Sequence, residues 1–532
     1  MSRRGSGVSR RGAASKRSAP ATAREAVEAL LQEGLGKRGF PAALELEANR
    51  AAQAAQERTP DRVDLVELPT FTVDPATARD FDDAVSARRE QSSIRLWIHI
   101  ADVAAHVPPG SPLDREAQRR ANSTYAPGTV EPMLPHALSE EACSLAPGVE
   151  RLAVTAEIEL GPDGRTARSR FYRSRIRSDA RLDYDHLDVI FAERAEAPQA
   201  VAEPLAIARD AAALLAGRRG ATELHVASSE PEFRFDSAGE VTGARGVAQT
   251  EAHRLIERLM ILTNEQVAEL LERRRVPAIY RVHGQPDPPR VERMLVQLHE
   301  LGIPTPPVQG TLAPRQAGEV AAEASRLVAR EAARRGHGRE TYTSLVLRSL
   351  QQAKYSERNS GHAGLGSEAY CHFTSPIRRY PDLVVHRALL AALGEGEEAP
   401  RTSVAREMAR HCSEAERESM RIERQADDVC AAYLLQREMR ERGPDADFEG
   451  EVSGTIRSGA FVRFGGELGD VYEGFLPARL IGGSERFELN DAETALVGQV
   501  SGGVVRLGDP VTVRPTRVQA ERGRVDLEPV DG

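Results

Sequence analysis

The chain has 532 residues, a formal net charge of −9 and a sequence pI of about 5.9. This length is too great for a single hydrophobic core of ordinary size, so we expect two or more domains. The acidic balance excludes a protein that coats polyanions through its overall charge, and any bound nucleic acid must therefore lie in a local basic channel.

Membrane and secretory classes are also not indicated. No apolar run approaches the roughly 18 residues of a membrane helix, and the N-terminus lacks the apolar core and cleavage site of a secretory signal. The four cysteines form no Cys-x-x-Cys pair, which argues against a zinc ribbon or a disulfide framework. A reducing cytoplasm is the expected location, without a membrane partner.

The N-terminal end is basic. Residues 1–24 hold seven arginine and lysine residues and no acid, which predicts a disordered tail. Such a tail either adds non-specific attraction for RNA or is simply solvated. From residue 25 to 59, the content of Ala, Leu, Glu and Arg predicts two short helices with a break near 34–36.

An acidic stretch follows at 72–84. Four carboxylates fall within ten residues of it: Asp74, Asp80, Asp82 and Asp83. They lie among residues typical of a core, such as Phe71 and Phe81, and clustered buried anions are costly unless a cation neutralises them. Hard oxygen ligands suit Mg²⁺ or Mn²⁺. The stretch therefore predicts a magnesium site that handles phosphate, with a solvated acidic turn as the alternative.

The middle of the chain alternates strands and helices. Apolar residues alternate at 94–100 and at 152–160, as in half-buried strands. Apolar residues recur at helical spacing in 251–273 and along one side of 402–442, which we expect to be helices. We expect a further helical stretch at 204–218.

A second unusual stretch, at 370–387, is basic and aromatic. Within it, Ser375-Pro376-Ile377-Arg378-Arg379 places two arginines in a turn that begins with proline. A guanidinium presents forked donors that match phosphate oxygens, so this turn is a reasonable counterpart to a phosphate at the acidic stretch. Taken alone, it would be an ordinary helix start.

The composition changes at Gly443-Pro444. Short apolar runs separated by glycines fill residues 446–530, which is typical of a small β-barrel.

Together, the two stretches resemble the ribonuclease II, or RNB, family of exoribonucleases. That family carries a Thr-(Ile/Val)-Asp-Pro…Asp-x-Asp-Asp-Ala signature and a His-Phe-Thr-Ser-Pro-Ile-Arg-Arg-Tyr signature, and both are present here, at 72–84 and 372–380. The resemblance implies an α+β fold. An RNB catalytic domain of mixed β-sheet with surrounding helices would occupy 60–443, and an S1-type OB-fold would occupy 446–530.

The resemblance also implies an activity: Mg²⁺-dependent hydrolytic 3′→5′ degradation of single-stranded RNA to nucleoside 5′-monophosphates, with Mn²⁺ as a possible substitute. The four aspartates would surround the metal, with Asp82 most directly tied to the chemistry. Arg378 would stabilise the charge that builds in the transition state, and Arg379 would hold a phosphate.

Further positions match family residues that contact RNA. Tyr125 would stack on the terminal nucleotide, Tyr184 and Glu257 would read the ribose 2′-hydroxyl, and Glu423 would lie near the same end. In the barrel, Phe461 and Phe464 are the candidates for base stacking. The alternatives are ordinary ones: core or rim tyrosines, a solvated ion pair for each glutamate, and barrel core for both phenylalanines.

The sequence departs from the family pattern in three places. The aromatic that often clamps the stacked bases is missing from 226–229, ahead of Pro231. In the barrel, Ser458 stands where an aromatic is usual, and the usual histidine is replaced around Pro477. Residues 25–59 are too few for the cold-shock barrels that many relatives carry.

Two other functional classes stay open. A catalytically silent RNA-binding relative would keep the fold without the reaction, although none of the acids and neither arginine is lost here. An endonuclease or a DNA nuclease built on the same site is the third hypothesis.

Overall fold

The computed structural model describes residues 20–36, 38–57, 62–219, 230–308, 310–465, 471–483 and 485–530. Residues 1–19 of the predicted tail and the segment 226–229 lie outside these ranges. The two predicted N-terminal helices are confirmed as α1 (Ala23–Leu35) and α2 (Ala42–Glu57). Because α1 already begins at Ala23, where Thr22 accepts a capping hydrogen bond, the predicted end of the tail at residue 24 is wrong.

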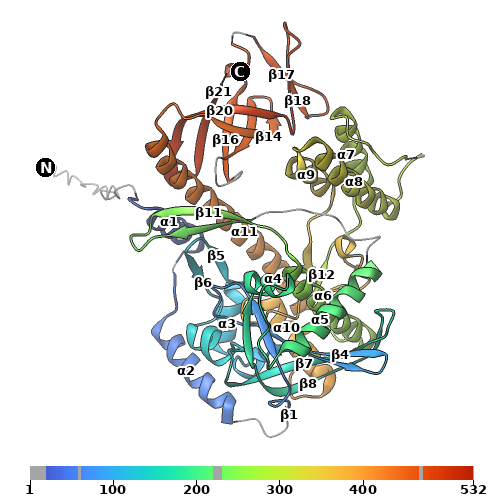
Figure 1. The fold of residues 1–532 in the computed structure, drawn as a ribbon. Helices are drawn as coiled ribbons and strands as arrows, with labels where there is room; N and C mark the ends of the chain where they lie inside the picture. Colours follow the sequence, from blue (N-terminus) through green and yellow to red (C-terminus); the bar gives the residue numbers. More distant parts are fainter. Residues whose placement is uncertain are drawn as a thin grey trace, which may run out of the picture.

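A seven-stranded sheet forms the centre of the lower body in Figure 1, with strand order β1-β8-β7-β4-β3-β2-β9. Its middle pairs are antiparallel, whereas β1 pairs with β8 and β2 with β9 in parallel. The strands are β1 (Val63–Asp64), β2 (Phe71–Asp74), β3 (Asp83–Glu90), β4 (Ser93–Ala101), β7 (Glu150–Leu160), β8 (Thr166–Arg177) and β9 (Ala180–Asp183). The strands predicted at 94–100 and 152–160 are confirmed as β4 and β7.

Helices and short hairpins surround this sheet. The helices are α3 (Pro112–Arg120), α4 (Tyr184–Phe191), α5 (Ala202–Arg219), α6 (Glu251–Arg274), α10 (Tyr380–Leu393) and α11 (Thr402–Arg442). Two hairpins pair β5 (Thr124–Ala126) with β6 (Thr129–Glu131) and β10 (Glu230–Phe235) with β11 (Val241–Val247). A third two-stranded ladder pairs β12 (Tyr280–Val282) with β13 (Lys354–Ser356), which lies beyond three further helices in the sequence. The predicted helices at 204–218, 251–273 and 402–442 are confirmed as α5, α6 and α11.

A buried polar network runs through the middle of the sheet. His99 of β4 is fully buried, with Nδ1 2.8 Å from Thr155 Oγ1 and Nε2 3.2 Å from Ser86 Oγ. Burial lowers the pKa of His99 to about 3. The His99 imidazole is therefore neutral in the folded protein. Below its unfolded pKa, the same imidazole binds a proton in the unfolded chain but not in the folded one.

We expect this histidine to make the fold sensitive to acid. Because its folded pKa lies below the unfolded value of 6.5, stability is lost as the pH falls below 6.5, by about 1.4 kcal/mol at pH 5.5. A His99→Gln variant keeps neutral hydrogen-bonding groups without the titration. Thermal unfolding at pH 7.5 and 5.5 should show a smaller loss for the variant than for the wild type, and equal losses would contradict the assignment.

Three helices form a separate unit that no sequence pattern predicted: α7 (Pro288–Glu300), α8 (Pro314–Arg335) and α9 (Arg339–Ser349). The unit packs against the C-terminal barrel, with Thr341 Oγ1 donating to Glu451 Oε1 at 2.6 Å. At Gly508, where φ is +81°, an added Cβ would lie 2.4 Å from the Tyr342 ring, so this interface requires glycine. Buried side chains of this unit share one hydrophobic cluster with the barrel.

The C-terminal part is a closed barrel with strand order β14-β15-β16-β21-β20, as the glycine-separated strands predict. Its strands are β14 (Phe448–Ile456), β15 (Gly459–Phe464), β16 (Tyr472–Pro477), β20 (Pro510–Gln519) and β21 (Arg524–Pro529). Beside it lies a small sheet of β17 (Phe487–Leu489), β18 (Ala495–Gly498) and β19 (Val504–Arg506). A five-stranded closed barrel of this size is the architecture of an OB-fold.

Helix α11 joins the two parts and runs from the lower body up to the barrel (Figure 1). Its first half packs in the core of the body that contains the large sheet, where Ala405 and Ala409 are buried. Its second half contacts the barrel, where Tyr472 donates from its hydroxyl to Glu438 Oε2 at 2.8 Å. No helix in the described ranges is long and apolar enough to cross a membrane.

Candidate active site

The acidic stretch is the connection between β2 and β3, and its shape is fixed by hydrogen bonds. Asp74 ends β2 and Asp83 begins β3. Between them, the guanidinium of Arg181 donates to two loop carbonyls at 3.1 and 2.6 Å. On the other side, Ser144 Oγ accepts from the Phe81 N–H at 3.0 Å. The carboxylates are therefore held at the end of the sheet by groups from β9 and from the loop before β7.

The arginine turn meets this loop directly. The Ile377 N–H donates to Asp82 Oδ1 at 2.8 Å, and Arg378 Nε lies 3.3 Å from Asp82 Oδ2. Arg379 points to the other side of the turn and donates to Asp382 Oδ1 at 2.7 Å. The two stretches that the sequence analysis singled out, 295 residues apart at this contact, thus form one site.

Burial dominates the electrostatics of the carboxylates. Asp82 is 3% exposed, and this burial raises its pKa well above the ordinary value, although Arg378 opposes the shift. Burial and then the charges of Asp83, Asp82 and Asp80 raise the pKa of Asp74 in the same direction. For Asp83 the pKa rises to about 6, against the lowering effect of the two arginines. Burial therefore disfavours the charged forms of these carboxylates unless a further cation compensates for it.

The donor set fits a hard cation only in part. Asp74 Oδ2 and Asp82 Oδ2 are buried and accept no hydrogen bond from any described residue. Within the same ranges, no three His, Cys, Asp or Glu side chains are arranged to hold a metal ion by themselves. Mg²⁺ typically takes one or two carboxylates and completes its octahedron with water and phosphate oxygens. Asp74 Oδ2, and Asp82 Oδ2 beside the Arg378 guanidinium, suit that kind of site rather than a closed protein cage.

Tyr125 lies at the acidic cluster, and Glu423 contacts Tyr125 there. The Tyr125 hydroxyl donates to Asp80 Oδ2 at 2.9 Å, and its backbone N–H donates to Glu423 Oε1 at 2.8 Å. Tyr125 is 40% exposed, so its ring lies at the rim of the acidic cluster rather than in the core. Glu423 comes from the middle of α11, so this helix also braces the site.

Tyr184 lies beside the acidic cluster, whereas Glu257 is linked to it only through its position on α6. Tyr184 follows β9, whose Asp183 is paired with Asp74 in the parallel ladder. Burial, and then the charges of Asp83 and Asp74, raise the pKa of the Tyr184 hydroxyl, as expected for a phenol beside the acids. Glu257 of α6 is half-buried and accepts from Gln249 Nε2 at 3.3 Å.

One aromatic neighbour of the site was missed from the sequence. The His253 ring stacks on the Tyr184 ring, with centroids 3.9 Å apart and an angle of 12° between the planes. The sequence offered one indication that His253 lies near the site. His253 precedes Glu257 by four residues, so both lie on the same face of α6.

The two barrel phenylalanines have different environments. Phe464 is fully buried and packs on Phe448 and Tyr472, with ring centroids 5.5 and 5.6 Å away. It cannot stack on a base, so the prediction that it binds RNA is wrong, and the barrel-core alternative holds for it. Phe461 is 37% exposed beside Phe475 and stays a candidate.

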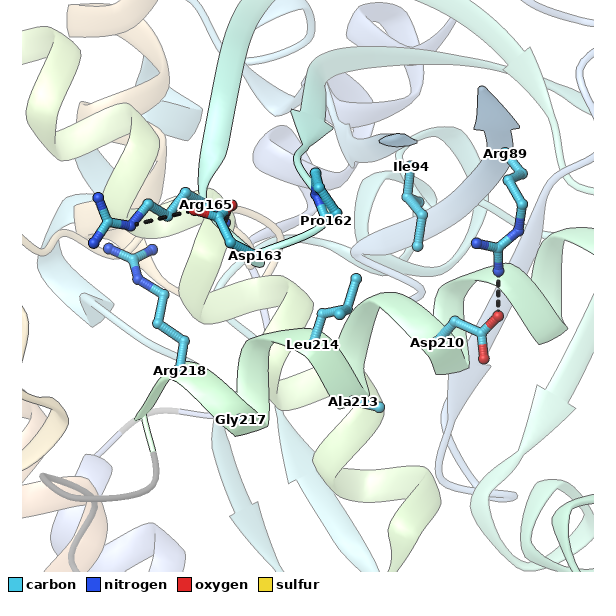
Figure 2. Close-up of a pocket in the computed structure, with 10 residues that line it drawn as sticks. All are labelled: Arg89, Ile94, Pro162, Asp163, Arg165, Asp210, Ala213, Leu214, Gly217 and Arg218. Carbon is cyan, nitrogen blue, oxygen red and sulfur yellow. Dashed lines mark hydrogen bonds and ion pairs between the residues drawn. The ribbon is translucent and has the colours of Figure 1, made fainter. Parts of the chain in front are cut away.

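A surface pocket of about 760 Å³ lies away from these residues (Figure 2). Ile94 and Leu214 form part of its wall, and an ion pair of Arg89 with Asp210 lies at one side. Arg89 is six residues after Asp83 on β3, which corresponds to about 20 Å. The pocket is therefore separate from the carboxylate cluster.

Comparison with known proteins adds three findings. Residues 62–395 match the RNB domain. The chain is 33% identical over 495 residues to Ribonuclease R 1 of Lactococcus lactis subsp. lactis, covering 90% of this chain and 58% of that protein. It is 36% identical over 487 residues to Ribonuclease R of Aquifex aeolicus, covering 90% of this chain and 66% of that protein.

A similar solved structure is that of Mycoplasma genitalium RNase R in complex with ribose methylated single-stranded RNA. The TM-score is 0.86 at 26% identity, covering 96% of this chain and 78% of that one. The chain thus spans 58% to 60% of the length of the first curated relatives that it matches.

Proposed function

Because this chain belongs to the RNB domain family, we propose that it is a hydrolytic 3′→5′ exoribonuclease that degrades single-stranded RNA to nucleoside 5′-monophosphates. The observation that carries the proposal is the contact between the two family signatures, in which Arg378 and the Ile377 N–H both meet the buried carboxylate of Asp82. The relatives named ribonuclease R support the same activity.

A divalent cation, Mg²⁺ or alternatively Mn²⁺, supplies charge neutralisation at the scissile phosphate when it is bound. Asp74, Asp80, Asp82 and Asp83 would hold it, with Asp74 Oδ2 as the most available ligand, since Asp82 Oδ2 also faces Arg378. Because the Tyr125 hydroxyl donates a hydrogen bond to Asp80 Oδ2, the Asp80 carboxylate also orients the tyrosine ring.

Arg378 and Arg379 have different roles toward the RNA phosphates. Arg378, beside Asp82 and 43% exposed at its side chain, reaches toward the reacting phosphate and stabilises the charge that develops there. Arg379 is held by Asp382, and its Nε is buried without a hydrogen-bond partner among the described residues. That spare donor suits a second phosphate of the strand.

The rim residues receive the 3′ end. The exposed ring of Tyr125 stacks on the terminal base, while Tyr184 and Glu257 hydrogen-bond to the ribose 2′-hydroxyl and Glu423 keeps Tyr125 in place. In the barrel, Phe461 offers a stacking surface for the incoming strand. The solved complex of the Mycoplasma RNase R with ribose methylated single-stranded RNA supports RNA as the ligand.

The four cysteines are free and buried, which suits the reducing cytoplasm. We place the enzyme there, in RNA turnover, with single-stranded RNA as its partner.

The test is a time course on a 5′-labelled single-stranded RNA of about 30 nucleotides, beside its DNA counterpart. With Mg²⁺ we expect the RNA ladder to shorten to a small labelled stub, and with EDTA we expect the rate to fall at least roughly 100-fold, because the carboxylates then lack their cation. The DNA should persist.

Other outcomes identify the competing classes. RNA binding without cleavage would indicate a catalytically silent relative. Internal cuts in an RNA with a blocked 3′ end, or degradation of the DNA, would indicate an endonuclease or a DNA nuclease.

A further inference from the structure

The backbone of Tyr184 is fixed from two sides. Its neighbour Asp183 lies in the parallel ladder between β9 and β2, directly across from Asp74. The same Asp183 caps α4, with Oδ1 accepting from the His186 N–H at 2.8 Å. These contacts place the Cα of Tyr184 beside the acidic cluster, but they leave its side-chain torsions undetermined.

His253 fixes the orientation of the Tyr184 side chain. Its ring lies 3.9 Å from the Tyr184 ring at an angle of 12°, so the two rings are stacked. His253 is itself held, because Nδ1 lies 2.7 Å from Thr250 Oγ1 and accepts from the Thr250 N–H at 3.4 Å. The two helices that carry the rings are joined by a hydrogen bond from the Ala252 N–H to Asp188 Oδ1, at 3.1 Å.

The stack lies next to the acidic cluster, because Tyr184 follows Asp183, which is paired with Asp74. Glu257 follows His253 by one helical turn on the same face of α6. We propose that His253 is a positioning residue, which holds the Tyr184 ring so that its hydroxyl faces the 3′-terminal ribose and thereby sets the preference for RNA over DNA. This inference rests on the proposed function, which puts the RNA 3′ end at this rim.

The test compares two 5′-fluorescein 12-nucleotide strands, one all-ribose and one with 2′-deoxyribose at its two 3′-terminal positions. Binding is measured by anisotropy in EDTA, so that no strand is cleaved. We expect the wild type to prefer the all-ribose end and His253→Ala to lose about 2- to 10-fold of that preference, the value of one aromatic pair. His253→Phe keeps a flat ring without the bond to Thr250 and should retain most of the preference.

His186→Ala is the matched control, since His186 is an exposed histidine of α4 and should leave the preference unchanged. An unchanged preference in His253→Ala, an equal loss in His253→Phe, or a wild type that does not distinguish the two ends would each overturn the inference. The same pair of strands with Mg²⁺ separates the two claims: wild-type cleavage with an unchanged ratio in His253→Ala refutes only the positioning role, whereas no cleavage by the wild type refutes the proposed function.

Discussion

Replacing Asp82 by asparagine is expected to abolish RNA cleavage while RNA binding is retained. Asparagine has the same shape, and its carbonyl oxygen can still accept from the Ile377 N–H, so the loop and the arginine turn should stay together. The substitution removes the negative charge that faces Arg378 and that would hold the cation. We expect the single-turnover rate with Mg²⁺ to fall by at least roughly 10³-fold, the scale of losing a principal electrostatic group in an active site.

The measurement pairs this rate with the Kd for the same RNA in EDTA, which should change less than about 3-fold, well under the effect of one lost charge-assisted hydrogen bond. Asp163→Asn is the control, because Asp163 lies on an exposed turn and pairs loosely with Arg165 at 3.5 Å. Equal losses of cleavage and binding would contradict the role given to Asp82, and so would cleavage that persists.

Replacing Arg378 by lysine should lower kcat by about 10²- to 10³-fold with little change in KM. Lysine keeps the positive charge but loses the planar fork, which here spans Asp82 at 3.3 Å and Ser375 Oγ at 3.1 Å. An interaction made chiefly in the transition state is lost, whereas the binding of the ground state is preserved.

Arg379→Lys provides the comparison within the same turn. Because Arg379 is tied to Asp382 and assigned to a phosphate that does not react, its substitution should raise KM more than it lowers kcat. Steady-state kinetics on one RNA substrate distinguish the two patterns. If Arg378→Lys changed only KM, the assignment of the two arginines would have to be exchanged.

The parts of the fold that follow local rules were predictable from the sequence. The period of apolar residues locates α6 and α11, and alternation locates β4 and β7, because each signal depends on neighbours within a few positions. The acidic loop and the arginine turn were also recognisable, since each signature is contiguous. Their contact through Asp82 could be inferred only from the family resemblance, because no local pattern links residues 295 positions apart.

Contacts between separate elements could not be predicted from local patterns, whereas the burial of the barrel phenylalanines could have been. The bond from Tyr125 to Asp80 joins separate elements, so the sequence gives no direct sign of it. For the stack of His253 on Tyr184 the sequence offers only the position of His253 one helical turn before Glu257, and not the contact itself. The difference between Phe461 and Phe464 was available, however. The two residues are an odd number of positions apart on β15, and successive side chains on a strand point to opposite faces, so only one of them can face the barrel core.

Helix α11 fixes the distance between the two parts of the molecule. Its 41 residues form one uninterrupted helix of about 60 Å. Glu423 holds Tyr125 beside the acidic cluster, and Glu438, fifteen residues later, holds the barrel through Tyr472. A continuous helix of this kind keeps these two contacts about 22 Å apart along its axis. The spacing between the acidic cluster and the barrel is therefore fixed by the number of helical turns between two glutamates, and not by the packing of a loop.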